Sequence, residues 1–395
     1  MPDDVTEWLA ARAVPLASLD PGAGPAGLRP LKAAFGGVRL VGLGEATHGS
    51  AEFFLLRWRL TEFLVKELGF TTLAIEASAA AARAVDAYTA GGPGDPREAL
   101  AGLGFWTLNT AEMLTVLQRL REHNRTADRP VRFVGIDPQH PMMALAELRG
   151  CLGQAAAPLL GPLGDLGASG FLRQLDRQVE ADARRLEEHV HEHGPPEARE
   201  PARIVRQFAD VASRPYTHAD PARTLGVARD RYMAENVALL MADPAAKVAV
   251  WAHNTHITKR ARAAPMMGTH LARTFGAAYY ALGLLFGHGE FRAHRRRFGR
   301  LVRGGPVRFR VPPADTGRNV EARLSAACPG DHVVDLRGGD RPEPVSAWLA
   351  APGELRSFGA VARRLTVRRT FTPTVLAEAF DGLAFLNRVG GSTPS

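Results

Sequence analysis

Short apolar runs rich in β-branched residues alternate with longer amphipathic segments in the first 140 residues of the chain. Three runs have the length and composition of buried strands: 38–43, 71–75 and 131–136. Three segments have the length and spacing of helices: 51–68, 79–90 and 110–123. Strands that alternate with helices predict a parallel sheet with right-handed crossover connections.

The pattern changes after this region. Residues 141–243 are helical in character and contain no convincing strand, so they predict a helical insertion. A buried strand is expected again at 247–252, and the runs 278–286 and 290–298 resemble a hairpin with its turn at Gly287-His288-Gly289. Shorter strands are expected at 306–311, 332–336 and 383–386.

These elements together predict a three-layer α/β/α fold with a mainly parallel mixed sheet. We expect residues 1–140 and 245–395 to form this α/β core and residues 141–244 to form the helical insertion. One large α/β body with an insertion fits the length of 395 residues as well as two or three separate domains do.

Composition excludes several classes of protein. Hydrophobic residues make up 46% of the chain, which is far too many for a disordered protein, and two cysteines are too few for a disulfide framework. The acidic start of the chain is unlike a secretory signal, and no apolar run approaches the roughly 20 residues that span a bilayer, so a cytoplasmic location is expected. The net charge is +8, but the basic cluster at 292–297 lacks interleaved aromatic residues. We therefore expect a small-molecule substrate rather than a nucleic acid or a membrane; the oligomeric state is not indicated.

Ionisable side chains follow four of the expected parallel strands. They are Glu45 and His48 after the first strand, Glu76 after the second, Asp137 and His140 after the third, and His253 and His256 after the strand that follows the insertion. Parallel strands point their carboxyl ends at one edge of the sheet, where ligands bind in open α/β folds. We expect these side chains to converge there.

Arg57 lies within the apolar stripe of its helix, whereas Arg59 points away from that stripe. A buried guanidinium needs a carboxylate partner, and Glu45 or Glu76 at the neighbouring strand ends could supply one. The alternative is that the stem of Arg57 lies along the core while its head reaches water.

Four further residues are candidates for contact with a ligand: Arg229, Asn236, Trp106 and Asp137. Helical projection of residues 229–240 places Arg229 and Asn236 on one side, which suggests the wall of a cleft. Trp106 follows a loop at the strand edge and is expected either in the core or against an apolar ligand. Asp137 could instead cap the helix that begins near Pro141.

Six segments also carry a resemblance to a known family. They are GEATHG at 44–49, the following helix with Arg57, IEAS with Glu76, GIDPQ at 135–139, RDRYMAEN at 229–236 and WAHNTHI at 251–257. In this order and spacing they resemble the erythromycin esterase family, from about residue 38 to residue 290. The resemblance implies an α/β sheet with helices on both faces, a hydrolytic pocket at the strand ends and a helical region that shapes substrate access.

The resemblance also implies roles for individual residues. The catalytic histidine of the family falls on His48, and its supporting glutamates fall on Glu45 and Glu76. Its arginine falls on Arg57, and its later pocket histidines fall on His253 and His256. Some members of the family act as esterases on macrolactones, so an ester or lactone of a macrolide or polyketide-type molecule is the implied substrate.

Our hypothesis for the reaction is attack by water on an ester or lactone carbonyl. His48 would take the proton while Glu45 or Glu76 holds its tautomer, and Arg57 with a protonated His253 or His256 would stabilise the oxyanion. No cofactor is expected. Ser50 is a less favoured nucleophile, because a small polar residue at that position caps the following helix.

Three alternatives stay open. A zinc ion could be held by the histidines and glutamates, although metal independence is favoured because H-E-x-x-H is absent. The same fold could bind a ligand such as haem without any chemistry. The runner-up keeps the scaffold for non-hydrolytic tailoring of a natural product, by proton abstraction, cyclisation, isomerisation or dehydration.

Overall fold

The computed structural model describes residues 3–166, 175–260, 264–297, 300–314 and 319–395. Its strands are β1 (Val14–Pro15), β2 (Leu40–Leu43), β3 (Thr72–Ser78), β4 (Arg132–Asp137), β5 (Val248–Trp251), β6 (Tyr279–Arg297), β7 (Arg300–Leu301), β8 (Val307–Val311), β9 (His332–Asp335), β10 (Pro352–Arg356), β11 (Val361–Ala362), β12 (Phe371–Val375) and β13 (Gly382–Val389). Its α-helices are α1 (Asp4–Arg12), α2 (Ala51–Leu68), α3 (Ala82–Thr89), α4 (Pro96–Gly102), α5 (Ala111–Thr126), α6 (Met142–Leu152), α7 (Ala156–Leu160), α8 (Arg177–His193), α9 (Pro196–Ala212), α10 (Leu225–Leu240), α11 (Asn254–Ile257), α12 (Met267–Phe275), α13 (Val320–Ala327), α14 (Glu343–Ala350) and α15 (Leu376–Ala379). None of these described helices is both long enough and apolar enough to cross a bilayer.

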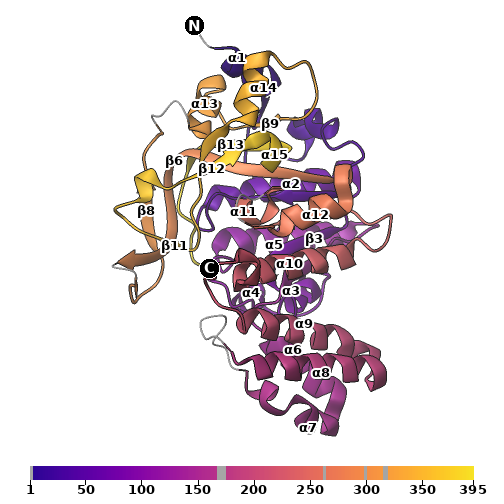
Figure 1. Cartoon of the computed structure of the whole chain (residues 1–395). Helices are drawn as coiled ribbons and strands as arrows, with labels where there is room; N and C mark the ends of the chain where they lie inside the picture. Colours follow the sequence, from indigo (N-terminus) through magenta and orange to yellow (C-terminus); the bar gives the residue numbers. More distant parts are fainter. Residues whose placement is uncertain (1–2, 167–174, 261–263, 298–299, 315–318) are drawn as a thin grey trace.

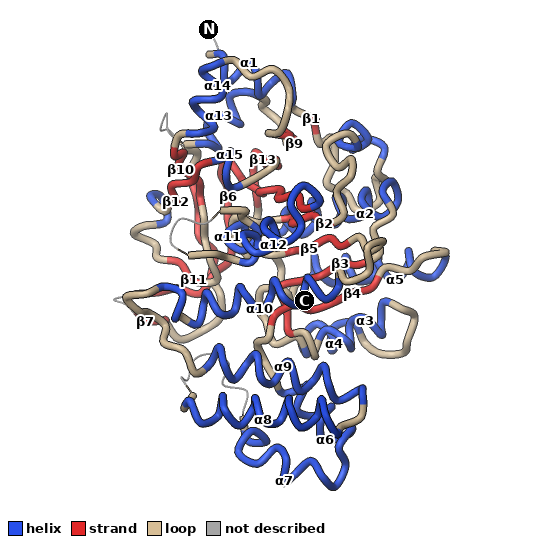
Figure 2. Tube along the Cα trace, turned by 45° about the vertical axis from the view of Figure 1, so that its right-hand side comes forward, coloured by secondary structure: helices blue, strands red, loops and turns tan. Residues whose placement is uncertain are grey.

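One large mixed sheet runs through the body of the molecule in the order β1-β9-β13-β6-β2-β5-β3-β4 (Figure 2). The six strands from β13 to β4 are parallel, while β9 and β1 are antiparallel additions at one end. The predicted mainly parallel mixed sheet and its α/β class are confirmed. Because β2, β5 and β3 are neighbours, the loops that follow them meet at the same edge.

Alternate residues of the central strands pack into two separate hydrophobic cores. On β2, Val41 and Leu43 join the core beneath α2 and α5, whereas Leu40 joins the core that contains α1, α10 and α12. Successive side chains of a strand point to opposite faces, so a strand covered by helices on both faces is apolar throughout. The predicted three layers follow from this arrangement.

The segment 141–244 contributes helices to two places. Helices α6 to α9 pack around a hydrophobic cluster of their own and project from one end of the molecule (Figure 1). Helix α10 instead buries Met233 and Val237 against the sheet.

The hairpin expected at 278–298 is wrong, because these residues up to Arg297 form the single 19-residue strand β6. Strand β13 pairs with β6 in parallel as far as Gly289, and β8 pairs with it in antiparallel from Gly289 onwards. At Gly289, where φ is 130°, a Cβ atom would lie 1.9 Å from the carbonyl oxygen of Val389. The glycine therefore permits close approach of two strands rather than a turn.

Arg59 also differs from its expected position on the outer side of α2. It is buried, and its guanidinium donates to the carbonyl of Gly24. The N-terminal 3₁₀ segment Ala26–Lys32 packs against α2, so the outer side of this helix is covered too. A helical projection describes one helix alone and does not include a segment that folds over it later.

Candidate active site

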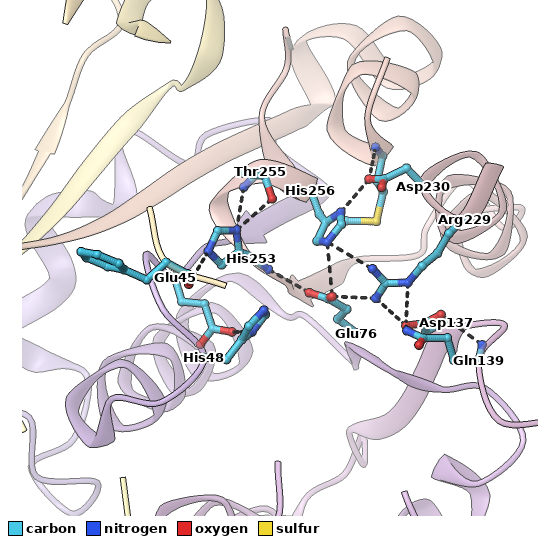
Figure 3. A network of polar contacts seen from close by, with 12 residues as sticks. Glu45, His48, Glu76, Asp137, Gln139, Arg229, Asp230, His253, Thr255 and His256 are labelled. Atoms are coloured by element: carbon cyan, nitrogen blue, oxygen red, sulfur yellow. Dashed lines mark hydrogen bonds and ion pairs between the residues drawn. The ribbon is translucent and has the colours of Figure 1, made fainter. Parts of the chain in front are cut away.

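The carboxyl ends of β2, β3, β4 and β5, with the loops that follow them, bring ionisable side chains together, and α10 adds two more (Figure 3). The side chains fall into two groups joined by hydrogen bonds and ion pairs. The first contains Arg57, Glu45 and His48. The second contains Glu76, Asp137, Arg229, Asp230 and His256, and His253 lies between the two groups. Convergence at the sheet edge, expected from the strand order, is therefore seen in these contacts.

His48 and Glu45 form the most direct pair in the first group. The Nδ1–H of His48 donates to Glu45 Oε1 at 2.7 Å, because a carboxylate offers only acceptors. This bond leaves the lone pair on Nε2, and that atom has no hydrogen bond within the described residues. The side chain of His48 is 18% exposed, so Nε2 is accessible at an otherwise buried site.

Arg57 lies behind Glu45 and away from the open edge. Its Nη2 atom is 2.9 Å from Glu45 Oε2, and its guanidinium lies between the rings of Phe54 and Trp251. The paired arrangement is thus the one observed, with Glu45 as partner rather than Glu76. Burial would raise the pKa of Glu45, but the charge of Arg57 and the hydrogen bond from His48 hold that pKa below its ordinary value. Glu45 is therefore an anion at neutral pH.

The loop that carries His48 is held on both sides by backbone hydrogen bonds. The N–H of Phe358 donates to the carbonyl of Ala46, and the N–H groups of Arg292 and Ser392 donate to the carbonyl of Gly49. A Cβ atom on Gly49 would lie only 1.9 Å from the carbonyl oxygen of Arg292. The glycine at this position is therefore needed for the contact between the loop and β6.

We expect Gly49→Ala to destabilise the protein by about 1 to 3 kcal/mol, because the added methyl must push the loop away from the Arg292 backbone. Urea unfolding measures this loss. Gly226→Ala is the matched control, since a Cβ atom there meets nothing within 4 Å on α10. Equal stability of the two variants would contradict the tight contact.

Arg229 organises the second group from α10. Its Nη2 donates to Glu76 Oε1 at 2.7 Å and to Asp137 Oδ2 at 2.5 Å, and its Nε donates to Asp137 as well. Burial would raise the pKa of Glu76, but His256 and Arg229 lower it well below its ordinary value. Asp137 also accepts from the N–H and the side chain of Gln139, so it does not cap α6.

His256 is held between two carboxylates. Its Nδ1–H donates to Asp230 Oδ1 at 2.7 Å, and its Nε2 lies 3.3 Å from Glu76 Oε1. Burial opposes the charged form, but Asp230 and Glu76 outweigh it and raise the pKa of His256 to about 10. His256 is therefore an imidazolium at neutral pH.

His253 has the opposite charge state. Burial, together with the nearby His48, lowers the pKa of its imidazole to about 4, so the ring is neutral. Its Nδ1 accepts from the N–H and hydroxyl of Thr255, and its Nε2–H donates to the carbonyl of Phe358 at 3.2 Å. A neutral ring with both nitrogens engaged cannot supply the positive charge that we considered for it, whereas His256 can.

His256 should make the stability of the protein depend on pH. Its folded pKa of about 10 lies above the unfolded value near 6.5, so its stabilising effect is complete below pH 6.5 and is lost as the pH rises towards 10. We expect the wild type to lose more of its free energy of unfolding over this range than His256→Gln does. Urea unfolding at several pH values gives the free energy of unfolding of each protein. The difference between the two proteins at each pH reports on His256, because the other titrating groups are common to both. A difference that does not change with pH would contradict the charged state of His256.

Two of the expected ligand contacts lie outside both groups. Asn236 is buried and donates to the carbonyl of Ile136 at 2.8 Å, and its amide is also bonded to Gln207 and Arg203. These bonds attach α10 to β4 and α9. Trp106 contacts the ring of His294, 5.5 Å between centroids, and lies beside Arg292. It therefore touches the strand that holds Gly49 rather than the groups themselves.

Ser50 precedes α2, but its side chain makes no capping hydrogen bond. The expected side-chain cap is therefore wrong. Instead, the preceding loop and the C-terminal residues meet the start of this helix, where the N–H of Ala51 donates to the carbonyl of Gly390. The carbonyl of Gly390 thus accepts from one of the free N–H groups in the first turn of α2.

Three participants were not expected from the sequence. Asp230 could have been found, because it shares a helical face with the buried residues Met233 and Val237, and a buried acid needs a partner. Thr255 and the carbonyl of Phe358 carry no such signal in the sequence, since a threonine or a backbone carbonyl can stand anywhere in a loop.

Among the residues that the structure describes, no three His, Cys, Asp or Glu side chains are grouped so as to hold one metal ion. Metal independence stays a prediction.

A cavity of about 930 Å³ reaches this region at α11, where Asn254 and Thr255 line it. Its wall is largely apolar and includes Met266, Leu355 and Phe380. Cavities of this size and character hold small organic ligands in other proteins.

Comparison of the sequence with known proteins relates this chain to one family. The sequence model of the erythromycin esterase family matches residues 65–389. An erythromycin esterase type II of Escherichia coli is 33% identical over 131 residues, which are 33% of this chain and 31% of that protein, so the match spans about a third of its length. Glu45, His48 and Arg57 precede the span of the family model, and their arrangement rests on the contacts described above.

Solved structures share the fold over almost the whole chain. A crystal structure of a Bacillus cereus protein has a TM-score of 0.83 at 25% identity and covers 99% of this chain and 98% of its own. A succinoglycan biosynthesis protein has a TM-score of 0.83 at 21% identity, with the same coverage of 99% and 98%. A mutant of the erythromycin esterase EreC in its open conformation has a TM-score of 0.70 at 21% identity and covers 94% of this chain and 96% of its own. The chain belongs to the erythromycin esterase family.

Proposed function

We propose that this protein hydrolyses an ester or lactone of a macrolide or polyketide-type small molecule, and that His48 activates the attacking water. Membership of the family supports an esterase-like hydrolase at the coarser level. The observation that carries the finer proposal is the pairing of His48 Nδ1 with the buried carboxylate of Glu45, which leaves Nε2 as an accessible base.

In this mechanism His48 is the base, and Glu45 and Arg57 support it. Glu45 accepts from Nδ1–H and so keeps the basic lone pair of His48 on Nε2. As His48 takes a proton from water, the anionic Glu45 stabilises the imidazolium that forms, as the carboxylate of a catalytic triad does. Arg57 holds Glu45 in place from the buried side and keeps it ionised. General base catalysis of this kind contributes roughly 100-fold to 10,000-fold in rate.

The second group supplies fixed charge near the reacting carbonyl. His256 is an imidazolium and Arg229 a guanidinium, and both are held rigidly by carboxylates. Positive charge that is already in position stabilises a developing oxyanion without reorganisation, an effect worth roughly 3 to 4 kcal/mol for one donor. We therefore assign oxyanion stabilisation to these cations rather than to Arg57, which is buried behind Glu45.

The size and character of the neighbouring cavity support this class of substrate, as does the family. A volume of about 930 Å³ with a largely apolar wall suits a large, mostly aliphatic molecule. Macrolides and polyketide-type lactones combine such a body with an ester carbonyl.

The test is a screen of macrolides and polyketide-type lactones by mass spectrometry, with the wild type and His48→Gln side by side. Hydrolysis adds the mass of one water to the substrate, and we expect this product only with the wild type. Products of unchanged mass would indicate isomerisation or cyclisation, and products lighter by one water would indicate dehydration. Either of these results would replace the hydrolytic proposal by non-hydrolytic tailoring on the same scaffold.

A further inference from the structure

A second cavity, of about 970 Å³, lies between β6, β8 and β13. Three arginines from three separate segments line it: Arg310 of β8, Arg388 of β13, and Arg368 of the 3₁₀ turn Val367–Arg369. We refer to the cavity as the arginine hollow. Its lining contains none of the residues of the two groups described above.

The pairing of the strands explains why two of these arginines meet. Arg388 lies opposite His288 of β6, and Arg310 lies opposite Glu290 of the same strand. Residues two apart in a strand share a face, so both guanidiniums project from one side of the sheet. The opposite side is apolar there, since Phe291 packs on Phe309 in the core.

The three guanidiniums have no carboxylate partner within the described residues. Two acids, Glu52 and Glu290, also line the hollow, but neither forms an ion pair with these three arginines within the described residues. Glu52 accepts from the N–H of Gly390 at 2.6 Å, and Glu290 lies 3.8 Å from Arg308.

The arginines of the candidate active site have a different arrangement. Arg57 and Arg229 are each held by carboxylates at 2.9 Å or less. In the arginine hollow three arginines outnumber the two acids, and they line a space large enough for a small ligand. Positive charge gathered on the walls of a concave surface concentrates anions there.

We propose that the arginine hollow binds the phosphate groups of a multiply charged ligand, either a nucleoside triphosphate or an inorganic polyphosphate. The planar guanidinium donates two parallel hydrogen bonds to phosphate oxygens, and three guanidiniums suit a ligand with several adjacent phosphates. Arg310 and Arg388 line the hollow from two strands of the sheet, and Arg368 lines it from the 3₁₀ turn.

Isothermal titration calorimetry of the full chain at low salt tests this proposal, with ATP, tripolyphosphate and inorganic phosphate as separate probes. We expect saturable binding of one ligand per chain for ATP or tripolyphosphate, and much weaker binding of inorganic phosphate. Tighter binding of ATP would identify a nucleotide as the ligand, and tighter binding of tripolyphosphate would identify a polyphosphate. Absence of saturable binding by both would overturn the proposal.

Two double variants distinguish binding in the arginine hollow from nonspecific attraction to the net positive charge of the protein. Arg310→Gln with Arg388→Gln should raise the Kd at least about tenfold, because each loses charge-assisted hydrogen bonds to phosphate. Arg303→Gln with Arg364→Gln removes the same charge from exposed positions outside the hollow and should change the Kd little. All four arginines are exposed, so both double variants should fold, and thermal melting checks this. Equal weakening by the two double variants would overturn the proposal, since binding would then reflect net charge alone.

Discussion

His48→Gln should lower kcat by about 100-fold to 10,000-fold on any lactone that the wild type hydrolyses, because the variant has no base at this position. Glutamine is the informative replacement, since its amide N–H can still donate to Glu45 while its side chain cannot accept a proton. Because glutamine is close to histidine in size and keeps the hydrogen bond to Glu45, the melting temperature should change little. Steady-state kinetics and thermal melting, made on the same preparation, measure both quantities.

The matched control for this substitution is His189→Gln, because His189 lies on the exposed surface of α8, among the helices α6 to α9 that project from one end of the molecule. It should leave both kcat and the melting temperature unchanged. Turnover by His48→Gln at the wild-type rate would remove His48 from the mechanism. A large fall in melting temperature would instead assign it a structural role.

Arg57→Met should have the largest effect on stability. The substitution leaves the buried carboxylate of Glu45 without its cation, and loss of one partner of a buried ion pair costs about 3 to 5 kcal/mol. Methionine keeps most of the apolar volume between Phe54 and Trp251, so the loss reports mainly on charge. Urea unfolding gives the free energy, and Arg119→Met is the control, because Arg119 pairs with Glu122 at the exposed surface.

A double-mutant cycle isolates the ion pair. Glu45→Gln removes the carboxylate that Arg57 compensates, so the variant with both substitutions should be less destabilised than the sum of the two single variants. Additive effects would show that Arg57 stabilises the protein through packing alone. The cycle is therefore a test of the assignment of Arg57 to Glu45, and it needs no substrate.

Much of the fold is predictable from local pattern. Helix α2 begins and ends at the predicted residues, because its apolar spacing is regular and Gly69 adopts the left-handed conformation that ends a helix. Strands β2, β4 and β5 lie within one or two residues of the apolar runs that predict them. The failure at β6 has a physical reason: its partner β13 lies about a hundred residues later, and local pattern cannot distinguish glycines that admit a neighbouring strand from glycines that turn.

For the candidate site, the sequence predicts which residues come together but not how they pair. Residues that follow neighbouring parallel strands must lie near one another, so the approach of Glu45, Glu76 and His253 follows from topology. The choice of Glu45 as partner of Arg57, and the opposite charge states of His253 and His256, depend on side-chain directions and on the carboxylate of Asp230 in α10. These are tertiary properties, and a pattern of residue types does not contain them.

The most direct test of the central claim is a single turnover in water labelled with heavy oxygen, followed by mass spectrometry of the product. If His48 activates water that attacks the carbonyl, the wild type should release an acid that carries one labelled oxygen, and His48→Gln should leave the substrate unchanged over the same time. An unlabelled product of unchanged mass, or labelled acid formed equally fast by the variant, would contradict the account.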